Sequence, residues 1–155
     1  ADPFNRFQSA QVVGARLVIR LARAEVPDEA AAMPFAQALD ALLAAEGERD
    51  PAFAAEVLNL ASVGDIIQEI GRDADPDAVF RARKLVRAAL GRVLSPRLLA
   101  LRDALASPGP YSPDAPSAGR RALRNAALDL VAAADPAEGL RLATAQFDAA
   151  DNMTD

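Results

Sequence analysis

The chain has 155 residues, of which 22 are acidic and 17 basic, and its formal net charge is −5. A nucleic-acid-binding protein needs a basic surface to displace counterions from phosphates, so this balance argues against that class. The sequence contains no His and no Cys, which excludes Ser-His and Cys-His nucleophile pairs, disulfides and thiolate metal sites, and leaves only carboxylates as zinc ligands.

Four Asp-Pro dipeptides predict helix starts along the chain. Asp is favoured at the N-cap of a helix, and Pro is favoured at the first helical position, where its missing N–H leaves no bond unmade. We interpret all four aspartates as caps rather than as catalytic acids, because the same local context occurs each time. The four are Asp2, Asp50, Asp75 and Asp135.

The first half of the chain predicts four helices. The first spans roughly residues 3–24 and is apolar on more than one face, which is typical of a helix between two layers. The second spans residues 34–46 and ends at Gly47, and the third follows Asp50. A short fourth helix opens at Ser62, with Asp65 placed for a capping box.

The second half predicts three further helices. Apolar residues recur at helical spacing after Asp75, and Pro96 within this segment indicates either a kink or a fresh start. Residues 107–116 carry four prolines and a glycine and predict a Pro-rich loop. A sixth helix is expected over residues 117–134, and a seventh opens at Asp135. The expected apolar faces are Val79, Val86, Leu90 and Val93; Leu123, Ala127, Leu130 and Ala134; and Leu140, Leu142, Ala143 and Phe147.

No segment shows the period-two alternation of a strand. The predicted fold class is therefore all-α, with stacked antiparallel helix pairs in HEAT-like or armadillo-like layers, and residues 1–155 form a single helical unit. Four phenylalanines lie on helix faces and are expected in the core, whereas Tyr111 in the Pro-rich loop is expected to be exposed and available for contacts. The four are Phe35, Phe53, Phe80 and Phe147.

No stretch is long and apolar enough to cross a membrane, because Arg16 and Arg20 interrupt "VVGARLVIRLA". The first residues lack the basic start and apolar core of a signal peptide, so we expect a cytoplasmic protein. The first residue is not Met, and we expect this end to be cut or processed.

Charged clusters offer few candidates for chemistry. Two basic clusters could bind phosphate or an acidic partner, but the acidic net charge favours solvated helix faces with local ion pairs. The acidic pairs Asp148 with Asp151 and Glu46 with Glu48 have no apolar setting that would raise a pKa, so surface charge is the better interpretation. The basic clusters are Arg81, Arg83, Lys84 and Arg87, and Arg120, Arg121 and Arg124.

Four segments resemble the last domain of the bacterial aminopeptidase N family of zinc-dependent alanyl aminopeptidases. "DPFNRFQSAQ" is similar to its Asp-Pro-Phe-Asn-Arg-aromatic opening, and "DPAFAAEVLNLASVGDI" is similar to a second family segment, with Ala61 where a Pro is expected. "RRALRNAALDLV" and "QFDAADNMTD" resemble two later segments. All four occur in the family's order and span nearly the whole chain.

The resemblance implies a fragment of the C-terminal helical domain of a peptidase that removes N-terminal residues from peptides. In that family zinc is held by a His-Glu-x-x-His helix and a downstream Glu, and a Gly-x-Met-Glu-Asn segment grips the substrate's amine; none of these occurs here. We therefore expect no catalytic residue, no metal ligand and no cofactor in this chain, zinc in the parent enzyme, and a role in enclosing the active-site chamber. Expected partners are the catalytic domain, the remaining C-terminal helices and the parent's peptide substrates, but no nucleic acid and no membrane.

The family-motif residues are expected to serve structure or interdomain contact. They are Asn5, Arg6, Arg124, Asn125, Asn152, Met153, Thr154 and Asp155. Because Asn152 or Thr154 could cap a helix that does not follow, we expect Asp155 to be a cut edge. A stand-alone helical repeat scaffold that binds a protein through a concave surface is the alternative, and a small nucleic-acid binder using the arginine clusters is less favoured.

Overall fold

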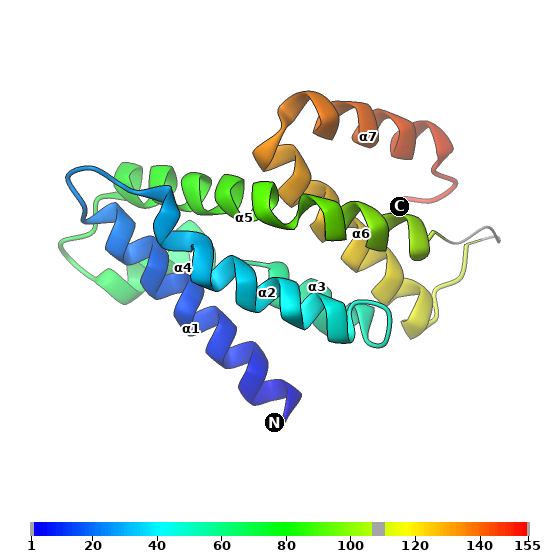
Figure 1. Cartoon of the computed structure of the whole chain (residues 1–155), viewed down its shortest axis with the longest axis horizontal. Coiled ribbons are helices and arrows are strands. Elements are labelled where there is room, and N and C mark those ends of the chain that lie inside the picture. Colours follow the sequence, from blue (N-terminus) through cyan, green and yellow to red (C-terminus); the bar gives the residue numbers. More distant parts are fainter. Residues whose placement is uncertain (1, 107–110, 155) are drawn as a thin grey trace.

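The computed structural model describes residues 2–106 and 111–154, and in these residues it contains seven α-helices, one 3-10 turn and no strand (Figure 1). The all-α prediction is confirmed. Successive helices reverse direction from α1 to α2 and again from α5 through α6 to α7, which gives the layered antiparallel arrangement that was predicted.

Helices α1 (Pro3–Ala22) and α2 (Met33–Glu46) form the first pair. The first ends two residues earlier than predicted, and a 3-10 turn, η1 (Glu29–Ala32), precedes the second. This turn was not predicted, although Asp28 caps it by accepting a bond from the backbone N–H of Ala30 at 2.9 Å.

Helices α3 (Pro51–Leu58) and α4 (Val63–Ile70) begin as predicted. The Asp50 carboxylate accepts a bond from the N–H of Phe53 at 3.0 Å. Ser62 and Asp65 form the expected capping box, with both reciprocal bonds at 3.1 Å. Gly71 ends α4 with φ +82°, a conformation that a residue with a Cβ rarely adopts.

Helix α5 (Pro76–Ala104) is the longest and contacts most other elements. It continues through Pro96, so the alternative of a fresh start there is wrong. Pro96 removes one backbone donor, and the Ser95 hydroxyl one residue earlier donates to the Gly91 carbonyl at 2.6 Å. The predicted apolar face is confirmed, because Val79, Val86 and Leu90 are buried and Val93 is partly buried against the core.

Helices α6 (Ala115–Ala134) and α7 (Pro136–Ala149) complete the fold. The predicted loop over 107–116 is too long at its far end, because Ala115 and Pro116 are helical; residues 107–110 lie outside the described part. Asp114 is an N-cap that the loop composition concealed, and it accepts a bond from the Ser117 N–H at 2.8 Å.

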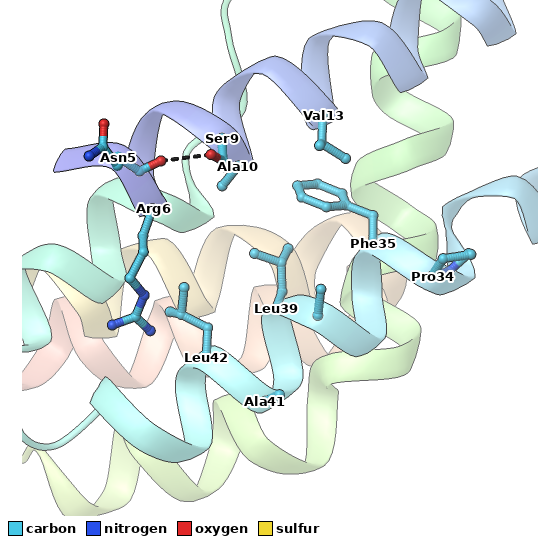
Figure 2. A pocket seen from close by; sticks show the side chains of 11 residues that line it. Asn5, Arg6, Ser9, Ala10, Val13, Pro34, Phe35, Leu39, Ala41 and Leu42 are labelled. Atoms are coloured by element: carbon cyan, nitrogen blue, oxygen red, sulfur yellow. Dashed lines mark hydrogen bonds between the residues drawn. The ribbon is translucent and has the colours of Figure 1, made fainter. Parts of the chain in front are cut away.

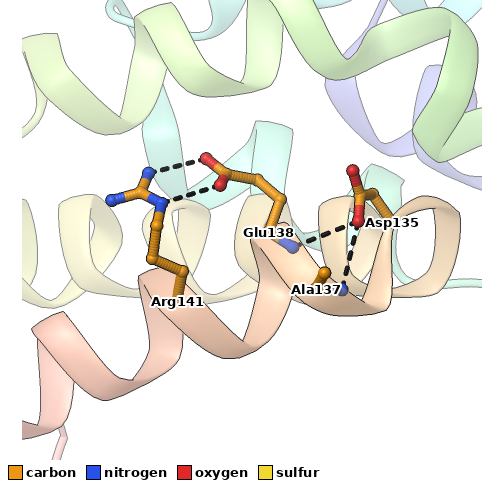
Figure 3. A network of polar contacts seen from close by, with 4 residues as sticks. All are labelled: Asp135, Ala137, Glu138 and Arg141. Carbon is orange, nitrogen blue, oxygen red and sulfur yellow. Dashed lines mark hydrogen bonds and ion pairs between the residues drawn. The ribbon is translucent and has the colours of Figure 1, made fainter.

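Three of the four predicted Asp-Pro caps are confirmed. Asp50, Asp75 and Asp135 each accept bonds from first-turn N–H groups, and Asp135 accepts from Ala137 and Glu138 at 3.1 Å (Figure 3). Asp2 precedes α1 as predicted, but its side chain makes no capping bond to the described residues.

Two of the phenylalanines expected in the core lie on the surface instead. Phe35 is buried and Phe53 is partly buried, whereas Phe80 is 59% exposed and Phe147 is 81% exposed. Leu140, on the predicted apolar face of α7, is also exposed. Helical spacing identifies an apolar face, but it does not establish that another element of the same chain covers that face.

Candidate interaction surface

The structure places the sequence-predicted site residues in two separate regions. Asn5 and Arg6 lie on α1, beside α2. The remaining described ones lie where α6 meets the segment after α7; they are Arg124, Asn125, Asn152, Met153 and Thr154. Asp155 lies outside the described residues.

A groove of about 660 Å³ runs between α1 and α2 (Figure 2). Its lining is mostly apolar, and Asn5 and Arg6 stand at one end. We call this the α1–α2 groove. Exposed apolar area of this kind is typical of a surface that another protein element covers. Its lining residues are Asn5, Arg6, Ser9, Ala10, Val13, Pro34, Phe35, Ala38, Leu39, Ala41 and Leu42.

Arg6, at one end of the α1–α2 groove, contacts residues of α2 and α3. Its Nη1 lies 2.7 Å from Oε1 of Glu46, which is only 6% exposed, and its guanidinium carbon lies 5.4 Å from the ring centre of Phe53. The bond from Arg6, and to a lesser degree the charge of Arg49, hold the pKa of Glu46 below its usual range. Arg6 therefore connects α1 to the end of α2 and to α3.

Glu46 was predicted to be a surface charge, and this prediction is wrong because the residue is buried. Arg6 is 40 positions away in the sequence, so local composition carries no sign of the pairing. Asn5, by contrast, is exposed, and its backbone carbonyl accepts a bond from the Ser9 hydroxyl at 2.7 Å (Figure 2).

A chain of polar contacts connects the second group of predicted residues. The Asn125 Nδ2 donates to the Thr154 carbonyl at 3.2 Å, and Gln146 Nε2 donates to Asn125 Oδ1 at 2.7 Å. Nη1 of Arg102 donates to Gln146 Oε1 at 2.9 Å and to the Arg124 carbonyl at 3.1 Å. Sequence reasoning missed Arg102 and Gln146; the one available signal was an Arg on the same helical face as Leu98 and Leu105.

The segment after α7 turns at Asn152. Its Oδ1 accepts bonds from the backbone N–H and the hydroxyl of Thr154, at 2.8 and 2.7 Å. A side-chain oxygen that accepts from the N–H two residues on has the geometry of a helix cap or an Asx turn. Met153 between them is fully exposed.

Two arginines of the first basic cluster bind residues of other elements. Arg87 pairs with Asp129 of α6, and Arg83 donates to the carbonyls of Leu60 and Ala61 at 3.2 and 2.8 Å. Arg83 and Arg87 are partly buried and bind other elements, so the prediction of a solvated face with local ion pairs is wrong for these two, whereas Arg81 and Lys84 are exposed.

The second cluster is tied to the loop that precedes α6. Arg121 donates to the Ser112 carbonyl at 3.0 Å, and its guanidinium carbon lies 4.8 Å from the ring centre of Tyr111. Tyr111 is 45% exposed, which confirms the expectation that this ring is accessible.

The residues present do not fit a zinc ion. The chain has no His or Cys, and within residues 2–106 and 111–154 no group of three or more acidic side chains is placed to hold a metal. None of the described helices is long and apolar enough to cross a membrane.

The stacked helices, with an apolar groove between α1 and α2 and polar contacts between neighbouring elements, form an all-α layered domain. The chain belongs to the family described as a domain of unknown function (DUF3458_C) with ARM repeats, whose model matches residues 1–155.

Two curated relatives share a name. Aminopeptidase N of Caulobacter vibrioides is 37% identical over 154 residues, which are 99% of this chain and 18% of that protein. Aminopeptidase N of Escherichia coli is 35% identical over 106 residues, which are 68% of this chain and 12% of that protein. The chain thus spans less than a fifth of the length of these relatives.

The fold also occurs in a solved structure, that of Legionella pneumophila aminopeptidase A in complex with aspartic acid. The TM-score is 0.79 with 20% sequence identity, over 99% of this chain and 19% of that one. At this level of identity the likeness concerns the fold alone.

Proposed function

We propose that this chain is a non-catalytic helical part of a zinc-dependent aminopeptidase that removes N-terminal residues from peptides. The observation that carries the proposal is the match to an aminopeptidase N. The identity is 37% over 99% of this chain, and the matched part is only 18% of that relative. In the resembled family this part lies in the C-terminal helical domain, and the zinc ligands lie in another domain.

The chemistry of the chain supports a non-catalytic part. A family zinc site needs two His residues and a Glu, and the sequence has no His. The chain therefore lacks the side chains that would hold a zinc ion and let it activate a water molecule. In this proposal zinc binds elsewhere in the parent enzyme, and the chain contributes packing and shape.

The exposed apolar surfaces support a place within a larger assembly. The α1–α2 groove and the outer face of α7, with Leu140 and Phe147, are the surfaces that a neighbouring layer or domain would cover. The partners proposed are the catalytic domain and further C-terminal helices, and together they enclose the chamber that admits the parent's peptide substrates. The cytoplasmic location remains a prediction.

Catalysis by the isolated chain is the direct test of the non-catalytic role. The purified chain is incubated with alanine p-nitroanilide, with and without added zinc, beside an authentic zinc aminopeptidase as control. We expect no hydrolysis above the rate in buffer and no zinc retained after dialysis. Zinc-dependent hydrolysis that follows the chain through two purification steps would contradict the proposal.

A further inference from the structure

Two arginines meet without an acidic partner where α5, α6 and α7 converge (Figure 1). Arg102 of α5 is only 8% exposed. The hydrogen bonds of its Nη1 go to the Arg124 carbonyl and to Gln146 Oε1, which are both neutral oxygens. Its positive charge is therefore buried against dipoles rather than against a carboxylate.

Arg124 of α6 is the second member. Its Nε is buried and has no hydrogen-bond partner in the described chain, and its guanidinium forms no ion pair with any described residue. Burial and then the charge of Arg124 lower the pKa of Arg102, and the exposed neighbour Asp103 does not cancel these effects. An unpaired donor in such a place costs free energy that a bound acceptor would recover.

Three of the other partly buried arginines have acidic partners, whereas Arg83 donates to the backbone carbonyls of Leu60 and Ala61. Arg6 pairs with Glu46, Arg87 with Asp129, and Arg97 Nη2 donates to Asp40 Oδ2 at 2.9 Å. The Arg102–Arg124 pair differs from these three, although the chain carries five more acidic than basic residues.

We infer that the Arg102–Arg124 pair is a binding site for a carboxylate group. A guanidinium presents parallel N–H groups along its Nε edge, and a carboxylate accepts them with both oxygens. A carboxylate is favoured over phosphate because a single charge loses less hydration on entering a mostly buried site. Gln146, which is held by Asn125, keeps Nη1 of Arg102 occupied and leaves the remaining donors of that guanidinium for the ligand.

The inference does not depend on the peptidase proposal, so each can fail separately. The probe is sodium acetate, added to the chain with isotope-labelled arginine side chains while sodium chloride is lowered to keep ionic strength constant. We expect the Nε–Hε resonance of Arg124 to shift saturably with acetate. An unchanged resonance up to high acetate overturns the inference, and an equal or stronger response to phosphate overturns the carboxylate assignment.

Two sources of the carboxylate are distinguished by small peptides. N-acetyl-aspartyl amide carries only a side-chain carboxylate, N-acetyl-alanyl-alanine carries only a terminal one, and the amide of the latter carries none. Tighter binding of the first assigns the site to an acidic side chain of a protein segment, and tighter binding of the second to a chain terminus. Equal shifts with the uncharged amide would overturn the inference.

Substitution tests the role of the parallel N–H groups of the Arg124 guanidinium. Arg124→Lys keeps the charge but loses the paired N–H edge, and we expect acetate affinity, read here from the Nε–Hε resonance of Arg102, to fall about tenfold. Arg120→Lys, at an exposed position on the same helix, is the matched control and should bind acetate as the original chain does. Arg102→Lys provides a second variant, read by its own acetate titration after circular dichroism has confirmed the fold. Unchanged affinity in both variants contradicts the assignment.

Discussion

Gly91 sets the distance between the two central helices. A Cβ built at this position would lie 2.1 Å from the Leu130 carbonyl oxygen and 2.8 Å from the Ala134 Cβ, so α5 and α6 approach each other at a point where only Gly fits. Gly91→Ala must push the helices apart, and we expect it to lower the free energy of unfolding by about 1–3 kcal/mol or more. Urea unfolding monitored by circular dichroism measures the change.

Gly64 in the first turn of α4 is the matched control for this substitution. The nearest atom to a Cβ there is the Ser62 Oγ at 3.7 Å, an ordinary contact. Because Ala loses less conformational freedom than Gly in a helix, Gly64→Ala should raise stability by about 0.5–1 kcal/mol. Equal changes in the free energy of unfolding for the two substitutions would show that the close helix approach does not make Gly91 sensitive to replacement.

Asp114 makes the N-cap of α6 sensitive to acid. The Ser112 hydroxyl, and then the backbone N–H and hydroxyl of Ser117, stabilise the carboxylate and lower its pKa to about 2. Because the folded pKa lies below the ordinary Asp value, the contribution to stability is complete above about pH 4 and is lost as pH falls towards 2. Carboxyl-carbon NMR should show this depressed midpoint, and Ser112→Ala should raise it. A titration midpoint near the ordinary value in the original chain would contradict the cap network.

The helix-capping roles of several residues were predictable from the local sequence. Asp50, Asp75 and Asp135 act as caps because the cap and the N–H groups it binds lie within three positions of each other. Glu46 and Arg102 could not be predicted, because their partners come from other helices and only the tertiary fold brings them together. The candidate site residues were found through family motifs, and their physical roles remain predictions.

At the scale of the element, apolar spacing predicted which face of α5 is buried, but it failed for α7. The same spacing over Leu140 and Phe147 describes a face that no described element covers. At Pro96 the local rule left a kink or a fresh start open, and the continuous helix, with Leu94 and Leu98 buried on either side, excludes the fresh start. Both outcomes depend on tertiary context, which sequence periodicity does not contain.

Helix α7 should be the least stable helix of the second half. Its main packing is against α6 at Gly139, where a Cβ would lie 2.4 Å from Ala132, and most of its larger apolar side chains face outwards. We expect its amide hydrogens to exchange through local opening, well before those of α5, in native-state hydrogen exchange read by mass spectrometry. Equal protection of α7 and α5 would contradict this ranking.

For the whole molecule, the layered fold was predictable because each helix carries its own start signals and the short connections force antiparallel neighbours. What covers the outer surfaces was not predictable. Val13 in the α1–α2 groove and Phe147 on α7 are 49% and 81% exposed, so they contribute little to the stability of this chain alone.

Serine substitutions distinguish outward from inward apolar residues. Val13→Ser and Phe147→Ser should each change the free energy of unfolding of this chain by less than about 0.5 kcal/mol, whereas Leu90→Ser, at a fully buried position, should cost several kcal/mol. Differential scanning calorimetry of the three variants checks the contrast. A large loss with Phe147→Ser would mean that α7 is packed inward in solution.

The central claim is that this chain is a non-catalytic layer of a larger zinc aminopeptidase. The most direct test uses antibodies raised against the chain to isolate its natural polypeptide from cells, followed by intact-mass, zinc and alanine p-nitroanilide measurements on the isolated protein. We expect a polypeptide several times longer than 155 residues that contains zinc and hydrolyses the anilide. A polypeptide of this length alone, without zinc or activity, would contradict the account and favour a stand-alone helical scaffold.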